Sequence, residues 1–284
     1  MNAFAIQLRE KLASRFSSEM QALLPKGYQR LGHVGIVQLD PLLQPHSTEI
    51  GKALLELVPG IQTACMRTGK ITGAFRQPPI EWIAGEKNTQ VEHHEHGCTF
   101  AFDCAKIMWA KGNVSERKRI YASVQPGERV MDFFAGIGYW TIPIARHSKP
   151  KKVIAFEANP LAVKYLRKNI SLNKIAKGIV EIAEGKCEEK SPGFGRTADR
   201  ILLGYIPAPF FALPSALACI KENGIIHFEG TAFAGGEGKL FEECQRIAQG
   251  NNMKLELLHT TLVKPFGPKI NHYTLDLRSI PQRR

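Results

Sequence analysis

The segment from Val130 to Tyr139, VMDFFAGIGY, most constrains what this chain can fold into. It reads as a buried strand, a glycine turn and the start of a helix, which we expect over residues 140–147. Gly136 and Gly138 permit a tight turn and a close approach to a ligand, and the helix points its N-terminal N–H groups into the same space. A second predicted strand follows and ends at Glu157, nineteen residues after Gly138. The pattern predicts a nucleoside-binding turn.

Two departures from the dinucleotide-binding pattern G-x-G-x-x-G indicate which nucleoside. Thr141 stands where the third glycine would be, and Asp132 ends the first strand four residues before Gly136. That carboxylate would repel a pyrophosphate but would suit the sulfonium or amino group of S-adenosylmethionine. An acid placed like Glu157 accepts hydrogen bonds from ribose hydroxyls. We therefore expect this turn to bind S-adenosylmethionine, although a glycine turn alone would also fit a plain strand-to-helix connection. The expected binding residues of the turn are Asp132, Ala135, Gly136 and Gly138, with Glu157 beyond it.

The net charge of +12, from 38 Lys and Arg against 26 Asp and Glu, indicates a polyanionic partner. A single basic run is typical of a solvated helix face, but phosphate contacts supply much of the affinity of proteins for nucleic acids. The sum of the runs therefore favours nucleic acid. The basic residues gather at 106–118, 149–152 and 164–174 and at the C-terminal Arg278, Arg283 and Arg284.

Other features restrict location and metal content. No apolar run reaches the ~18 residues of a membrane span, and the first twenty residues read as an amphipathic helix rather than a secretory signal. We expect a cytoplasmic protein with no membrane partner. The six cysteines include no C-x-x-C pair, which predicts reduced core thiols. His93, His94, His96 and Cys98 lie in a predicted hairpin that turns at residues 95–97, where neighbouring side chains face opposite ways, so we expect no metal.

The order of predicted elements indicates two domains, at residues 1–105 and 106–284. The first is expected to be a smaller α+β domain with a leading helix, a strand within 33–40, a helix at 47–57 and a hairpin within 91–103. The second alternates strands and helices, which predicts an α/β, Rossmann-like parallel sheet with right-handed crossovers. Its expected strands are 129–133, 152–156, 180–183, 199–203 and 224–228, its helices 160–172, 208–220 and 239–250, and its closing strands 254–263 and 271–278, the last antiparallel.

Ligands bind at the carboxyl ends of the strands in such sheets. Glu184 and Gly185 follow the third predicted strand, and Gly204 and Tyr205 follow the fourth. Glu184 could accept the exocyclic amine of adenine or be a solvent-facing loop acid. Arg117, in the segment NVSER ahead of the sheet, could grip a methionine carboxylate bidentately or be one more exposed helix arginine. Both alternatives stay open.

The motifs KIMW, NVSERKR, DFFAGIG, FE, ADRILLGY and HYTLDLR, in that order, resemble one archaeal and eukaryotic family. It contains the tRNA guanosine-N1 methyltransferase and its wybutosine-pathway relative, a 3-amino-3-carboxypropyl transferase. The resemblance covers nearly the whole chain and implies a class I methyltransferase fold with S-adenosylmethionine as donor. It implies cofactor contacts at Arg117, Glu157 and Glu184, and at Ala110, where relatives have a serine. The chain departs from the family in lacking that hydroxyl and in having Gly185 in place of an asparagine.

The end of the fourth strand separates the two branches of the family. The methyltransferases carry an Asn-Leu-Pro or Asn-Pro-Pro type of motif there, whereas Leu203-Gly204-Tyr205 resembles the aminocarboxypropyl branch. The resemblance thus implies transfer of the 3-amino-3-carboxypropyl group to C7 of 4-demethylwyosine, next to the anticodon of phenylalanine tRNA, with release of 5′-methylthioadenosine. A tRNA guanosine-N1 methyltransferase is the alternative. The intact turn argues against an inactive RNA-binding protein, and the +12 charge argues against a polyamine-like acceptor. No general base is evident.

Overall fold

The computed structural model describes residues 2–69, 71, 73 and 75–281. Contacts divide the chain into two compact units, Met1–His94 with Thr99–Trp109, and Glu95–Cys98 with Ala110–Arg284. The division falls within a hairpin of β5 (Gln90–Glu95) and β6 (Cys98–Asp103), which confirms the predicted hairpin. No helix among the described residues is long and apolar enough to cross a membrane.

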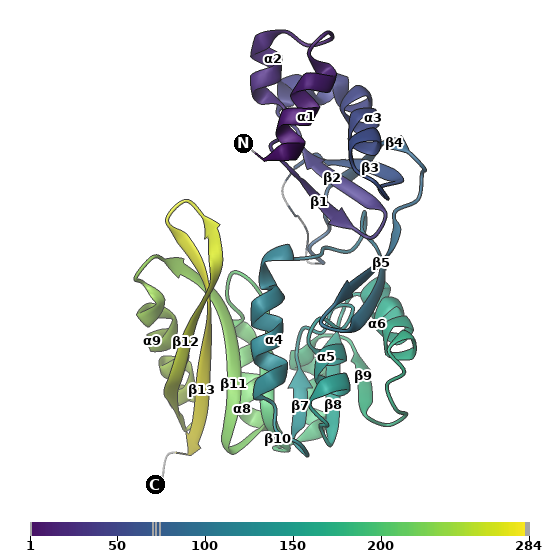
Figure 1. Cartoon of the computed structure of the whole chain (residues 1–284). Helices are drawn as coiled ribbons and strands as arrows, with labels where there is room; N and C mark the ends of the chain where they lie inside the picture. The colour runs from purple at the N-terminus through teal and green to yellow at the C-terminus, as the bar shows by residue number, and fades with distance from the viewer. Residues whose placement is uncertain (1, 70, 72, 74, 282–284) are drawn as a thin grey trace. The chain divides into compact units, whose positions relative to one another are not determined.

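The first unit is a four-stranded sheet with helices packed on it (Figure 1). The strand order is β1-β2-β3-β4, with β2 and β3 parallel and both outer pairs antiparallel. Helix α3 (Ser47–Leu57) lies between β2 and β3 in the chain and buries Ile50, Ala53 and Leu54 in the core of this unit. The strands are β1 (Tyr28–Leu31), β2 (Val34–Gln38), β3 (Thr63–Arg67) and β4 (Ile80–Gly85).

Sequence patterns predicted only part of this unit. The strand within 33–40 and the helix at 47–57 are confirmed as β2 and α3. The expected leading helix is present but ends before residue 20, and a second helix starts where the Ser17 hydroxyl accepts a hydrogen bond from the N–H of Met20. The two helices are α1 (Ala3–Leu12) and α2 (Ser18–Leu23). Strand β3 is buried at four successive positions, so it lacks the alternation that identifies a half-exposed strand.

The second unit contains a seven-stranded sheet in the order β12-β13-β11-β10-β7-β8-β9 (Figure 1). The five strands from β11 to β9 pair in parallel, and β13 is antiparallel to both of its neighbours, as predicted. The strands are β7 (Arg129–Asp132), β8 (Lys152–Glu157), β9 (Val180–Glu184), β10 (Ala198–Leu203), β11 (Ile220–Phe233), β12 (Met253–Gly267) and β13 (Ile270–Pro281). The last three are longer than the sequence predicted.

Helices cover both faces of this sheet. The largest apolar core lies against α7 (Cys187–Lys190), α8 (Leu213–Cys219) and α9 (Glu237–Gly250), and a second core lies against α4 (Val114–Ser123) and α5 (Thr141–His147). Helix α6 (Pro160–Leu172) has the predicted bounds. The helix predicted over 208–220 is shorter: Pro214 suits the first turn of α8, and a separate 3-10 turn, η4 (Phe210–Ala212), precedes it.

Candidate functional site

The glycine turn lies at the carboxyl ends of β7 and β8. Gly136 and Gly138 have φ values of +56° and +100°, a region that favours glycine. A Cβ at Gly138 would overlap Ile142, so space as well as backbone conformation requires glycine. The N–H of Ala135 donates to the carbonyl of Phe156 at 3.0 Å, which ties the turn to the end of β8. The structure thus holds the predicted turn rigidly.

Glu157 ends β8 and binds the turn with its own carboxylate. Its Oε2 accepts from the N–H of Gly136 at 2.7 Å, and its Oε1 accepts from the N–H of Asn159 at 2.7 Å. Burial raises the pKa of Glu157, and these backbone N–H groups oppose that rise. A carboxylate has about four acceptor positions, so both oxygens can accept a further hydrogen bond, as a ribose would require.

Asp132 lies beneath the turn rather than on its surface. Its side chain is fully buried, and its Oδ2 accepts from the hydroxyl of Thr141 at 2.8 Å. Burial raises the pKa of Asp132 to about 7, and nearby Glu157 acts in the same direction. Thr141, which replaces the third glycine of the dinucleotide pattern, therefore holds this acid inside the protein. The structure places Asp132 behind the expected ligand-facing surface.

Glu184 and Gly185 stand beside Glu157 at the next strand end. Glu184 pairs with Glu157 in the register of β8 and β9, and the N–H of Gly185 donates to the carbonyl of Glu157 at 2.9 Å. The Glu184 side chain is 53% exposed and forms an ion pair with Arg167. The position therefore fits an adenine-facing acid and also fits an exposed acid with an arginine partner.

Arg117 is buried on α4 and already holds a carboxylate bidentately. Its Nε and Nη2 donate to Oε1 and Oε2 of Glu95, both at 2.6 Å. Its Nη2 also lies 3.3 Å from the carbonyl oxygen of Ala110. Because Arg117 is only 3% exposed, it is not one more exposed helix arginine. Sequence analysis missed Glu95, which stands twenty-two residues away in the hairpin and carries no local signal of this role.

Gly204 and Tyr205 follow β10 and border an aromatic cluster. A Cβ at Gly204 would overlap the indole ring of Trp140 at the start of the helix after the glycine turn. The Tyr205 ring lies 5.2 Å from that of Phe134 and 5.6 Å from that of Phe211. Phe211 is 51% exposed. Sequence analysis identified Gly204 and Tyr205 but missed these three aromatic partners.

The histidines of the hairpin make separate contacts. His93 packs against the ring of Trp109, His94 contacts the hydroxyl of Thr99, and His96 contacts the carbonyl of Val114. Across the described residues, no group of three or more His, Cys, Asp or Glu side chains could hold a metal ion. All six cysteines are free and buried.

The glycine turn, the acids beside it and Gly204 after β10 agree with the family that comparison of the sequence with known families identifies. Residues 91–256 match the TRM5/TYW2 methyltransferase domain, and residues 8–89 match the TYW2 N-terminal domain. The chain belongs to the TRM5/TYW2 methyltransferase family. The family resemblance expected from the motifs is thereby confirmed.

Relatives within this family come from both branches. The chain is 36% identical over 277 residues to a tRNA(Phe) (4-demethylwyosine(37)-C(7)) aminocarboxypropyltransferase of Pyrococcus horikoshii, covering 96% of each. It is 30% identical over 261 residues to the tRNA (guanine(37)-N(1))-methyltransferase Trm5b of Pyrococcus abyssi, covering 92% of this chain and 77% of that protein. The crystal structure of P. horikoshii TYW2 in complex with MeSAdo superimposes with a TM-score of 0.85 at 32% identity, covering 98% of this chain and 100% of the other. The predicted fold class is confirmed.

Proposed function

We propose that this protein transfers the 3-amino-3-carboxypropyl group of S-adenosylmethionine to C7 of 4-demethylwyosine, next to the anticodon of phenylalanine tRNA. The observation that carries the proposal is the end-to-end similarity to a relative of that name, at 36% identity over 96% of both chains. The match of residues 8–89 to the TYW2 N-terminal domain supports the same branch. The guanine methyltransferase relative is less similar and extends beyond the matched region.

The residues at the carboxyl strand ends fit S-adenosylmethionine. Glu157 has acceptor capacity for a ribose, and it lies directly beside the positive-φ turn of Gly136 and Gly138. We assign these residues, with Ala135, Glu184 and Gly185, to the adenosine portion. Bound S-adenosylmethionine would supply a sulfonium whose neighbouring carbons are electrophilic, so the protein's main task is to select and align one carbon.

Arg117 is the residue we assign to the methionine carboxylate, beside the backbone of Ala110. The two carboxylate oxygens of Glu95 accept hydrogen bonds from two nitrogens of the Arg117 guanidinium. This pairing fixes the plane of the guanidinium within the protein. A guanidinium fixed in this way can set the direction of a bound carboxylate, which a lysine ammonium cannot do. We therefore propose that Glu95 positions Arg117 and that Arg117 orients the aminocarboxypropyl group toward the acceptor.

The end of β10 supports the branch assignment. Trp140 fills the space in which a side chain at Gly204 would stand, so the polar asparagine contact of the methyltransferases has no room at this residue. Phe134, Tyr205 and Phe211 offer aromatic faces at the same edge. Proteins recognise unstacked RNA bases by stacking them on such side chains. We infer that this cluster receives the flat tricyclic base.

The charge of the chain supports a tRNA acceptor. With +12 overall, phosphate neutralisation should make tRNA affinity fall steeply as salt rises, with a log–log slope of several units. A filter-binding titration between 50 and 200 mM salt measures that slope. A flat dependence would favour a small acceptor instead. A tRNA acceptor also supports the cytoplasmic location expected from the sequence.

Identification of the sulfur-containing product tests the proposal. The protein is incubated with S-adenosylmethionine and phenylalanine tRNA that carries 4-demethylwyosine, and the small molecules are identified by mass. We expect 5′-methylthioadenosine. The matched control is the same tRNA with unmodified guanosine at the target position, which should give no product. S-adenosylhomocysteine formed with the control tRNA would support the guanosine-N1 methyltransferase alternative and would contradict the proposal.

A further inference from the structure

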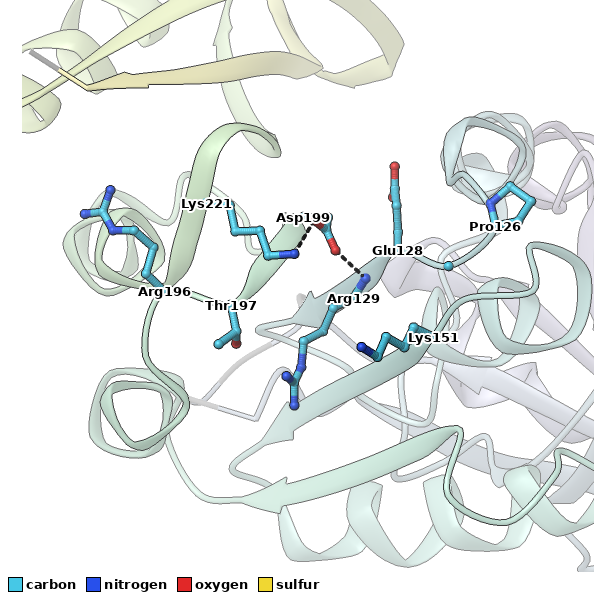
Figure 2. A pocket seen from close by; sticks show the side chains of 9 residues that line it. Pro126, Glu128, Arg129, Lys151, Arg196, Thr197, Asp199 and Lys221 are labelled. Atoms are coloured by element: carbon cyan, nitrogen blue, oxygen red, sulfur yellow. Dashed lines mark hydrogen bonds and ion pairs between the residues drawn. The ribbon is translucent and has the colours of Figure 1, made fainter.

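A basic pocket opens at the edge of the seven-stranded sheet opposite to the glycine turn (Figure 2). It has a volume of about 480 Å³. Arg129 begins β7, Lys151 directly precedes β8, and Lys221 stands near the start of β11. The pocket therefore lies at the amino ends of the strands, within the second unit. Its lining residues are Pro126, Gly127, Glu128, Arg129, Lys151, Arg196, Thr197, Asp199 and Lys221.

The two acids of this pocket are already used by other groups. Glu128 accepts two hydrogen bonds from Arg200, at 2.7 and 3.0 Å, and Arg200 does not line the pocket. Asp199 accepts from Lys221 Nζ at 2.6 Å and from the backbone N–H of Arg129 at 2.8 Å (Figure 2). These hydrogen bonds lower the pKa of Asp199 although burial opposes the change. Asp199 therefore stays ionised but is consumed within the protein.

Two cations of the pocket, Arg129 and Lys151, have no hydrogen-bonded carboxylate, although the charge of Lys151 helps to lower the pKa of Asp199. Among the described residues, the side chains of Arg129 and Lys151 form no hydrogen bond or ion pair, and Arg196 contacts only the sulfur of Met253, at 3.6 Å. The Nε of Arg129 is buried and has no hydrogen-bond partner. A buried donor without a partner costs free energy, and neighbouring like charges repel each other. An anion in the pocket would relieve the repulsion between the cations.

We propose that this pocket binds a phosphate group. The guanidinium of Arg129 and the ammonium of Lys151 are the kinds of donor that proteins use for phosphate, because an Arg fork matches its oxygens and Lys adds a point charge. The side chain of Arg196 points away from these two (Figure 2). Lys221 contributes further positive charge at the rim beside Asp199. The phosphate can come from a free anion such as pyrophosphate or from the backbone of an RNA. The site is separate from the glycine turn, so it does not depend on the proposed transfer reaction.

Calorimetry with pyrophosphate tests the site directly. The full-length protein should bind one pyrophosphate in low-salt buffer. Because each charge-assisted contact contributes substantially, Lys151→Gln should weaken binding about tenfold and Lys151→Gln with Arg129→Gln about a hundredfold. Lys254→Gln, an exposed lysine of β12 outside the pocket, is the matched control and should bind like the wild type. If the double variant fails to fold, the single variant Lys151→Gln still tests the site.

A second titration separates the two sources of phosphate. If the pocket receives an RNA phosphate, Lys151→Gln should lower the slope of log affinity for tRNA against log salt by about 1, while Lys254→Gln leaves it unchanged. If the pocket receives a free anion, the slope stays the same and only pyrophosphate binding falls. The proposal is overturned if neither pyrophosphate affinity nor the tRNA slope differs between wild type and the folded pocket variants.

Discussion

The two ends of the strands in the seven-stranded sheet carry charges of opposite sign. The strands end in acids at the carboxyl edge and begin with cations at the amino edge, and these charges differ in how they are paired. Strand β7 begins at Arg129 and ends at Asp132, and β8 begins at Lys152 and ends at Glu157. Helix dipoles favour this arrangement, since helix N-termini gather at the carboxyl edge of a parallel sheet and C-termini at the amino edge. At the carboxyl edge Asp132 is buried and bonded to Thr141, and the partly buried Glu157 accepts a hydrogen bond from the N–H of Gly136. At the amino edge Arg129 keeps an unpaired side chain.

The comparison shows that charge alone does not reveal a ligand site. At the carboxyl edge Asp132 supports the turn from inside the protein, whereas Glu157 both holds the turn and keeps acceptor positions for a ligand. At the amino edge Lys152 and Lys221 pair with Glu181 and Asp199, whereas Arg129 and Lys151 form no ion pair among the described residues, so the charge of these two is available to an anion. Substitutions made at one edge at a time test this division.

The largest expected effect concerns the buried acid of the carboxyl edge. The pKa of Asp132 is about 7 in the folded protein against a usual 3.8. The folded state therefore holds the proton of Asp132 up to a higher pH than the unfolded state does. The contribution of this group to the stability of the fold is complete below about pH 4 and is lost as the pH rises toward 7. Three pKa units correspond to roughly 4 kcal/mol.

Asp132→Asn tests that pH dependence. The variant keeps a side-chain oxygen for the Thr141 hydroxyl but cannot ionise, so its free energy of unfolding should fall less than that of the wild type between pH 4 and pH 8. Urea unfolding at several pH values measures the difference. Parallel curves for the two proteins would show that the Asp132 carboxyl does not titrate in this range.

Replacement of the arginine of the carboxyl edge should reduce the transfer rate. Arg117→Lys removes the guanidinium that binds Glu95 through two nitrogens. A misplacement of the reacting group by about 1 Å can cost on the order of a hundredfold in rate. Affinity for 5′-methylthioadenosine, which lacks the carboxylate, should change much less. Single-turnover assays and calorimetry give the two quantities. Arg246→Lys, an exposed arginine paired with Glu243, is the control. If Arg117→Lys keeps full activity, Arg117 does not orient the aminocarboxypropyl group.

Glu157→Ala should weaken binding of 5′-methylthioadenosine by ~1.5–3 kcal/mol, the usual loss for hydrogen bonds to a charged group. The loss has two sources, because the variant removes the ribose acceptor and also releases the N–H of Gly136 from its partner. Calorimetry on the folded variant measures the change. Unaltered affinity would remove Glu157 from the site.

Gly204→Asn tests whether Trp140 excludes a side chain at the end of β10. The added atoms would overlap the indole ring, and overpacking of this kind typically costs ~1–3 kcal/mol. Thermal or urea unfolding reports the loss. A second variant that also carries Trp140→Leu should recover part of it. If Gly204→Asn alone keeps full stability, the indole does not determine the residue at this position.

The smallest effect is expected at the amino edge. The ion pair of Lys221 with Asp199 is partly exposed, with side chains 47% and 31% accessible, and exposed pairs contribute less than ~1 kcal/mol. Lys221→Gln also removes one charge from a crowded set of cations. We therefore expect a change in the free energy of unfolding below ~1 kcal/mol. A larger loss would mean that the basic edge has a structural role comparable with that of the acids.

The second unit follows the sequence closely because its signals are local. Alternation of strands and helices predicted β7, β8 and α6 within a residue or two, and the glycine turn marked the carboxyl edge. The first unit was less predictable, since β3 is buried at successive positions and shows no alternation. The domain division at residues 105 and 106 stays a prediction.

The positions of the candidate residues at the strand ends could be predicted from the sequence, but their contacts could not, and their binding roles stay a proposal. Spacing from the turn identified Glu157, and its position at the strand end follows from the fold. Nothing in the sequence pairs Glu95 with Arg117, or brings Trp140 against Gly204, because those contacts join residues far apart in the chain. The inward orientation of Asp132 likewise depends on the Thr141 hydroxyl, which becomes visible only when the helix is in place.

The fate of two isotopic labels tests the central claim most directly. S-adenosylmethionine labelled in its carboxyl carbon, and separately in its methyl carbon, is incubated with the wild-type protein and phenylalanine tRNA carrying 4-demethylwyosine. If the protein transfers the aminocarboxypropyl group, the carboxyl label enters the tRNA while the methyl label remains in released 5′-methylthioadenosine. Methyl label in the tRNA, with the carboxyl label left in S-adenosylhomocysteine, would contradict the account and identify a methyltransferase.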